Sequence, residues 1–397
     1  MIFPFYSKTL LAILFGSMLF GVWQGCALER DAGENRPLLE ISDRADAEWP
    51  AETEIEYAEG FRLHYADTYK ILQILNPFQH TTDTLTYVLV DRGAEPPDGF
   101  ADAEVIEIPV RSVIVTSTTH IALLKMLEAE HVIRGIAGAE YVYDPEIRKG
   151  IEEEKIAAFR GGEFNKEIAL AIDPDLIMIS GGQASQFDSY RVLIDSGIEV
   201  VVNSEWLENT PLGKAEWVKM MAALLDREEI ADEKFGQVSA RYRALLEKTD
   251  TVQQKPLVIN NLPYKGAWFV SGGRSFTANF FRDAGGDYPW YGTESSGGLR
   301  LNFERVYEAG LRADVWINPG TAESKEDLLA VDTRFRDFRA FQTGRIYNNN
   351  RRVSPGGGND FWESGTVHPE RVLADLIRIF HPELLPDHTL YYYQKVE

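Results

Sequence analysis

Residues 165–180 read NKEIALAIDPDLIMIS and give the strongest indication of the fold. Asn165 can cap a short helix, and Leu176 to Ile179 are apolar at every position, which is typical of a strand buried on both faces. Residues 302–320, NFERVYEAGLRADVWINPG, repeat the same order of residue types. A helix followed by a continuously apolar strand, found twice, predicts two similar α/β lobes, each with a parallel sheet covered by helices.

A second, weaker repeat and a long helical segment support two lobes. Residues 113–120, VIVTSTTH, resemble residues 268–274, WFVSGGR. Apolar residues then recur at helical spacing from Pro211 to Lys248, and Thr210 can cap the start of this segment. One long helical segment amid short alternating elements indicates a spine that joins two Rossmann-like lobes. Because open α/β sheets bind ligands at the carboxyl ends of their strands, we expect a ligand cleft between the lobes.

The N-terminal residues predict export from the cytoplasm. Lys8 is the only charge before an apolar run from Leu10 to Trp23, which at about 14 residues is shorter than the roughly 20 that span a bilayer. Cys26 follows where a lipoprotein signal is cut, so we expect a lipid anchor there, with ordinary cleavage nearby as the alternative. The mature chain would then lie in the periplasm or cell envelope, held to the membrane only by that lipid. The expected divisions are a signal peptide at 1–25, a flexible tether at 26–53, an N-terminal lobe at 54–209, a helical spine at 210–250 and a C-terminal lobe at 251–397.

The charge and cysteine counts exclude several classes of protein. With 40 Lys and Arg against 62 Asp and Glu, the net charge of −22 leaves no basic surface for a nucleic acid. The single cysteine excludes an intramolecular disulfide and a thiolate metal cluster. None of the seven histidines forms a His-x-His or His-x-x-x-His pair. We therefore expect no dedicated site for a bare metal ion and no covalently bound cofactor.

The chain resembles the helical-spine class of periplasmic substrate-binding proteins of ABC importers, the group that carries ferric siderophores, haem and cobalamin. The resemblance covers about residues 60–385 and lies in the order and spacing of its pieces rather than in any one of them. These pieces are residues 165–181, the spine at 211–248, the run 271–276 (SGGRSF) leading to 284–287 (AGGD), residues 302–318, and residues 341–347 (FQTGRIY).

The resemblance implies a partner and a role for two glutamates. In this class one glutamate on the upper face of each lobe docks against arginines of the ABC permease dimer, and the matching positions are Glu167 and Glu304. Carboxylates in the first turn of exposed helices are free to meet paired cations, although each could instead only complement the dipole of its own helix. The resemblance also implies a monomer that catalyses no reaction.

The loops after the predicted strands carry aromatic and cationic side chains. Aromatic walls suit a large, flat, partly apolar ligand, and guanidinium groups match carboxylate or catecholate oxygens. We therefore expect a metal chelate in the cleft, an iron complex such as a ferric siderophore or haem, with cobalamin as the alternative within the class. For any one of these aromatic residues the alternative is core packing, and for any one arginine it is a solvated surface. The expected ligand-binding residues are Thr118, His120, Tyr143, Trp206, Tyr264, Trp268, Arg274, Trp290, Arg300, Arg351, Arg352 and Trp362.

Two other classes of protein stay open. One is an enzyme of the cell envelope on a two-lobed α/β scaffold. Against it, residues 293–297 (TESSG) fail the Gly-x-Ser-x-Gly pattern at the first position, and the glycines at 356–358 lack the strand-then-helix context of a dinucleotide fingerprint. The other is a lipid-anchored receptor that works without a permease, and only Glu167 and Glu304 separate it from an importer component.

Overall fold

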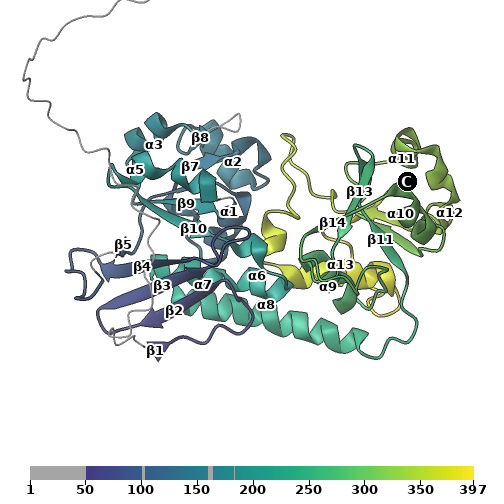
Figure 1. Cartoon of the computed structure of the whole chain (residues 1–397), viewed down its shortest axis with the longest axis horizontal. Coiled ribbons are helices and arrows are strands. Elements are labelled where there is room, and N and C mark those ends of the chain that lie inside the picture. The colour runs from purple at the N-terminus through teal and green to yellow at the C-terminus, as the bar shows by residue number, and fades with distance from the viewer. Residues whose placement is uncertain (1–50, 101–102, 160–163, 183) are drawn as a thin grey trace, which may run out of the picture. The chain divides into compact units, whose positions relative to one another are not determined.

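The structure is a computed structural model that describes residues 51–100, 103–159, 164–182 and 184–397 (Figure 1). The expected signal peptide, Cys26 and the tether up to residue 50 lie outside the described residues. Within the described residues, no helix is both long enough and apolar enough to cross a membrane.

A five-stranded sheet opens the described chain. Its strands follow one another in sequence order, antiparallel up to the fourth, and the fifth runs parallel to the fourth. They are β1 (Ala51–Glu52), β2 (Phe61–Tyr65), β3 (Tyr69–Leu75), β4 (Thr84–Asp91) and β5 (Glu104–Ile108). Strand β3 was not predicted, because its apolar residues Ile71, Leu72, Ile74 and Leu75 do not alternate with polar ones.

The N-terminal lobe contains a fully parallel sheet in the order β10-β9-β6-β7-β8, which confirms the predicted fold class. Leu176 and Met178 of β9 pack into one apolar cluster, and Ile177 and Ile179 pack into another, so the sheet is covered on both faces. The strands are β6 (Val113–Val115), β7 (Ile133–Ala137), β8 (Ala157–Phe159), β9 (Leu176–Ser180) and β10 (Glu199–Asn203), with helices α1 (Thr118–Met126), α2 (Pro145–Glu152), α3 (Lys166–Ile172), α4 (Ala184–Asp188) and α5 (Arg191–Ile194).

The spine consists of three consecutive helices, α6 (Pro211–Glu216), α7 (Val218–Leu225) and α8 (Glu228–Thr249). The helical path breaks between α7 and α8 because Asp226 adopts a left-handed conformation, with φ of 52°. Trp217, between α6 and α7, is fully buried and packs edge-on against Phe61 of β2, with ring centroids 5.0 Å apart. The spine therefore also forms one wall of the core beneath the N-terminal sheet.

Two buried glutamates tie the residues before β2 to the spine. The carboxylate of Glu216 accepts hydrogen bonds from the backbone N–H groups of Glu56, Tyr57 and Ala58 at 2.6–3.0 Å. The carboxylate of Glu208 accepts from the N–H groups of residues 59 and 60 and, at 2.9 Å, from the indole of Trp217. These bonds satisfy a run of backbone donors that no strand partner reaches.

The C-terminal lobe has a four-stranded sheet and a separate antiparallel three-stranded sheet (Figure 1). The first is β11 (Val258–Asn260), β15 (Val315–Ile317) and β16 (Ile346–Asn348), all parallel, with β17 (Gln394–Lys395) antiparallel at the edge. The second is β12 (Pro263–Tyr264), β13 (Ala267–Ser271) and β14 (Gly298–Leu301). The helices are α9 (Phe276–Asp283), α10 (Phe303–Gly310), α11 (Lys325–Val331), α12 (Arg339–Thr343) and α13 (Pro369–Phe380).

The first sequence repeat corresponds to a repeated structure. The side-chain oxygens of Asn165 and Asn302 cap α3 and α10, each accepting a backbone N–H at 3.0 Å. The carboxylates of Asp175 and Asp314 each accept a backbone N–H just ahead of the neighbouring strand, at 2.8 Å and 2.9 Å. The second predicted repeat is wrong, because residues 268–271 belong to the antiparallel sheet and the counterpart of β6 is β11.

Candidate functional site

A pocket of about 310 Å³ is lined by residues of both lobes. The N-terminal lobe contributes Gln79 and residues 206–208, which follow β10. The C-terminal lobe contributes Asn261, residues 269–271 of β13, residues 275–277 at the start of α9, and residues 296–298 at the start of β14. The strand ends of both lobes thus meet at one cavity, as predicted for a two-lobed α/β protein.

Trp206 forms the aromatic wall on the N-terminal side. Its indole N–H donates to the carbonyl of Gly181, which follows β9. Only glycine fits there, since a Cβ at Gly181 would lie 2.1 Å from the carbonyl oxygen of Pro77. The hydroxyl of Ser204 donates a hydrogen bond to this carbonyl of Pro77 at 2.7 Å. The tryptophan is therefore fixed by backbone at the carboxyl end of the parallel sheet.

Phe269 is the corresponding aromatic residue on the C-terminal side, and it is 43% exposed. It lies directly opposite Arg300 in the antiparallel register of β13 and β14. Residues at opposite positions project from the same face of a sheet, so the exposed Arg300 extends beside Phe269. Asn261 holds this strand by donating its side-chain amide to the carbonyl of Phe269 at 2.8 Å.

Apart from Leu207, Val270, Phe276 and two glycines, the rest of the pocket lining is polar, and its one ionisable residue is Glu208. Burial raises the pKa of Glu208, while the hydrogen bonds from Trp217 and the backbone lower it. Lys214 of α6 lies near the floor, with its ammonium 5.0 Å from the centroid of the pocket-lining Phe276 ring. Burial lowers the pKa of Lys214, although the charge of Glu205 opposes this. The lining itself offers mostly hydroxyl and amide groups to a ligand.

Three of the predicted ligand-binding residues are core residues instead, which corrects the prediction. Trp268 is fully buried and packs against Phe303, Trp316, Phe335 and Phe338. Trp290 is buried edge-on against a tyrosine ring. His120 is fully buried in α1, and desolvation lowers its pKa to about 3, so the imidazole is neutral. In each case the ring fills space in the close-packed core of its lobe.

The other predicted residues lie outside the pocket lining. Tyr143 and Arg352 meet where the lobes touch, with the guanidinium 5.1 Å from the ring centroid. Arg274 forms an ion pair with the exposed Glu294. Thr118 is half-buried at the first residue of α1, whereas Tyr264, Arg351 and Trp362 are exposed. Of the predicted set, the structure places Trp206 in the pocket wall and Arg300 beside it.

Glu167 and Glu304 occupy equivalent places in the two lobes. Each is exposed and lies in the first turn of its helix, two residues after the capping asparagine. The hydrogen bond to Asp332 raises the pKa of Arg334, and the nearby charge of Glu304 adds to this effect. The two side chains are therefore presented by matched local structures.

Phe269 was not among the predicted ligand-binding residues, although the pattern of its strand contains a signal for it. In Trp268-Phe269-Val270 the outer two residues are buried and Phe269 projects the other way, as alternation along a strand requires.

Among the described residues, no group of three or more His, Cys, Asp or Glu is placed to hold a metal ion.

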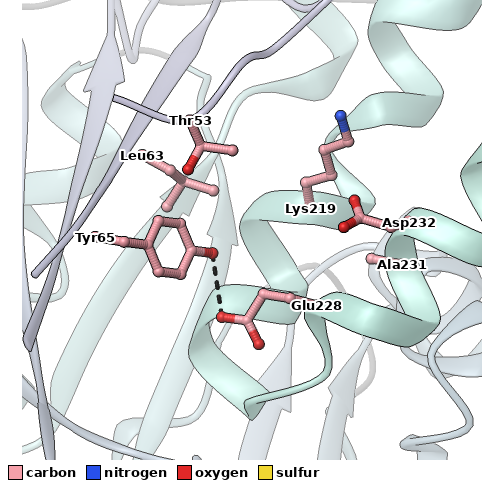
Figure 2. Close-up of a pocket in the computed structure, with 7 residues that line it drawn as sticks. All are labelled: Thr53, Leu63, Tyr65, Lys219, Glu228, Ala231 and Asp232. Carbon is pink, nitrogen blue, oxygen red and sulfur yellow. Dashed lines mark hydrogen bonds between the residues drawn. The ribbon is translucent and has the colours of Figure 1, made fainter. Parts of the chain in front are cut away.

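A smaller pocket of about 220 Å³ lies between β2 and the helices α7 and α8 (Figure 2). Tyr65 donates its hydroxyl to Glu228 at 3.1 Å, and Glu228 also pairs with Lys70. Lys219 lies on the opposite wall and pairs with Glu216 at 2.8 Å. Glu228 and Lys219 are thus both paired within the protein. We therefore interpret this pocket as a structural contact between the sheet and the spine rather than as a ligand site.

Comparison with known proteins identifies a family and several relatives. The model of the family described as "Periplasmic binding protein" matches residues 113–351, more than half of the chain. An uncharacterized lipoprotein of Methanocaldococcus jannaschii is 26% identical over 418 aligned positions, covering 98% of this chain and 96% of the relative. A second uncharacterized lipoprotein of that organism is 25% identical and covers 86% of this chain and 87% of the relative.

Solved structures share the fold at low sequence identity. A possible iron-binding, periplasmic solute-binding protein of Staphylococcus epidermidis is 18% identical with a TM-score of 0.54, covering 68% of this chain and 98% of that protein. A periplasmic haem-binding protein of Pseudomonas aeruginosa is 16% identical with a TM-score of 0.55, covering 72% of this chain and 98% of that protein. These similarities support the two-lobed fold.

Proposed function

This chain belongs to the periplasmic binding protein family, and we propose that it captures a metal chelate, an iron complex such as a ferric siderophore or haem, between its lobes. Proteins of this class bind small-molecule ligands and work with ABC permeases, so this is a solute-binding protein rather than an enzyme. We propose further that it delivers its ligand to an ABC permease dimer as a monomer.

The pocket between the lobes supports this proposal best. Trp206 and Phe269 supply an aromatic wall from each lobe, and Arg300 extends on the same face as Phe269. Aromatic faces bind a flat or partly apolar ligand, and a guanidinium beside them pairs with carboxylate or catecholate oxygens. An anionic chelate would use both features.

A corrinoid such as cobalamin is the second candidate. Gln79, Asn261 and the hydroxyl groups of Ser275 and Thr277 give the pocket lining a neutral, hydrogen-bonding character. The amide side chains of a corrinoid need such partners, and they need no cation. Arg300 at the rim therefore favours an anionic chelate, whereas the neutral lining favours a corrinoid. A binding assay can distinguish the two.

The location and the docking surface belong to the same proposal. A relative over nearly the whole chain is named a lipoprotein, which supports export and a lipid anchor at Cys26. The matched, exposed positions of Glu167 and Glu304 support docking of both lobes to a permease.

Ferric siderophores, haem and cobalamin should be titrated separately against the purified protein, with Trp206 as the fluorescent reporter. We expect Phe269→Ala to weaken binding about tenfold, because it removes the aromatic contact on one side. Arg300→Gln should weaken binding of an anionic chelate by about threefold to fivefold and leave cobalamin unaffected.

Two exposed residues outside the pocket lining provide matched controls. Arg274→Gln and Tyr264→Ala should keep the affinity of the unmodified protein, since neither lines the pocket. If no chelate of the three quenches the fluorescence or raises the melting temperature, the proposed ligand class is wrong.

A further inference from the structure

A second connection between the lobes lies apart from the spine. Residues 352–363, which we call the strap, follow β16 in the C-terminal lobe and lie against residues 140–144 of the N-terminal lobe. A Cβ at Gly358 would lie 2.4 Å from the carbonyl oxygen of Tyr141, so backbone packs directly on backbone there. Only glycine at this position allows the strap to approach so closely.

Glu363 makes the polar contact at the end of the strap. One carboxylate oxygen accepts the backbone N–H of Tyr143 at 2.8 Å, and the other accepts that of Asp144 at 3.0 Å. Glu363 is 3% exposed, so the joined lobes bury it almost completely. Its sequence distance from Tyr143 is 220 residues, which makes this a contact between lobes rather than a local turn.

We propose that Glu363 is a positioning residue for ligand capture, and that the protonation of its carboxyl group sets how readily the two lobes separate. The effect of protonation on lobe separation concerns the protein without ligand. Only the step from lobe separation to ligand affinity rests on the proposed function.

The direction of the pH dependence follows from the burial of Glu363. Desolvation raises its pKa from 4.5 to about 7, outweighing the two backbone donors that lower it. When the lobes separate, the carboxyl group meets water and its pKa returns to the ordinary value. The carboxyl group of Glu363 binds its proton more tightly when the lobes are joined, so acid favours the joined state. Above about pH 7 the joined state must instead bury an ionised carboxylate. This difference in pKa corresponds to a shift of up to about 300-fold in the equilibrium between joined and separated lobes from strong acid to above pH 7, of which about tenfold falls between pH 6 and pH 8.5.

The charged groups around Glu363 are paired with one another. Asp144 pairs with Lys125 of α1 at 2.6 Å, and Asp360 of the strap pairs with Arg352 at 2.6 Å. The charges of both aspartates raise the pKa of Glu363. The surrounding titratable groups are Tyr143 and Tyr391 on either side of Arg352, Arg371 over Tyr391, and His368 paired with Glu370 at the start of α13.

The test measures the distance between the lobes in the full chain without ligand. Spin labels at Val192→Cys and Val331→Cys, both exposed and one in each lobe, are read in a Cys26→Ser background. We expect longer distances to be more populated at about pH 8.5 than at about pH 6. Glu363→Gln should show the same distances at both values, because the side chain no longer titrates.

Glu104→Gln is the matched control. Burial also raises the pKa of Glu104 to about 7, but this residue lies in β5 and its nearby charges are Glu199 and Arg191. We expect this variant to keep the pH response of the unmodified protein. Distances that do not change with pH in the unmodified protein, or a response that persists in Glu363→Gln, overturn the proposal.

A steric variant tests the strap without titration. Gly358→Ala places a methyl group against the carbonyl of Tyr141, so we expect the longer distances at both pH values. Gly236→Ala in α8 is the control, since a Cβ there meets nothing within 4 Å. Unchanged distances in Gly358→Ala would show that the strap does not hold the lobes.

Ligand titrations then test the link to capture. A chelate that binds between joined lobes should bind more tightly at about pH 6 than at about pH 8.5, and Glu363→Gln should remove that difference. An affinity difference that survives in Glu363→Gln contradicts the link. Because the distance measurement uses no ligand, it can succeed where the chelate assay fails, and the reverse also holds.

Discussion

Reversing the charge of both Glu167 and Glu304 to lysine is expected to abolish uptake of the ligand into cells while leaving ligand binding intact. Both carboxylates are exposed in first turns capped in the same way, and neither lines the pocket between the lobes. If both lobes dock to permease arginines as proposed, two lysines would replace two attractions by two repulsions, each worth several kcal/mol. Uptake is measured in cells that carry the partner permease, and binding by tryptophan fluorescence of the purified variant.

The control for this experiment reverses two other first-turn glutamates. Glu229→Lys in α8 and Glu326→Lys in α11 change the net charge by the same amount. We expect this double variant to import the ligand normally. Loss of binding in the Glu167 and Glu304 variant would place them at the ligand, and loss of uptake in the control would show a general effect of charge.

Asp375→Ala is expected to lower the free energy of unfolding by about 4 kcal/mol, the largest effect on stability that we predict. Asp375 is fully buried in α13, and its carboxylate accepts the backbone N–H groups of Tyr391, Tyr392 and Tyr393 at 2.7–3.1 Å. His388 contacts the same carboxylate at 2.7 Å. Removing the acceptor leaves a run of buried donors without a partner and frees the residues that lead into β17.

Chemical denaturation measures this loss. Asp232→Ala serves as the control, because Asp232 is an exposed residue of α8. We expect the control to unfold at nearly the same denaturant concentration as the unmodified protein. A loss below about 1 kcal/mol in Asp375→Ala would mean that water replaces the carboxylate.

The fold could be predicted because its determinants are local. Asn165 and Asn302 cap their helices by short-range bonds, and the apolar strands that follow Asp175 and Asp314 need no distant information to be recognised. Short strands such as β12, β14 and β17 were missed, because two to four residues carry too little pattern.

The site was predicted less completely, for reasons of geometry. The sequence locates β13 but not which of its faces packs on the core, so Trp268 was predicted to bind ligand and Phe269 was overlooked. Arg300 was predicted from its charge, while its place opposite Phe269 depends on strand register. Glu363 gave no signal at all, because its partners lie in the other lobe.

The N-terminal sheet has a consequence for where this protein can be cut. The family model begins at residue 113, yet β2 packs Phe61 against Trp217, and Glu208 and Glu216 hold residues 56–60. A gene shortened to the family boundary would remove one wall from the spine, expose the Trp217 indole to water and leave two buried glutamates without their backbone donors. The smallest fragment worth expressing therefore starts no later than β1.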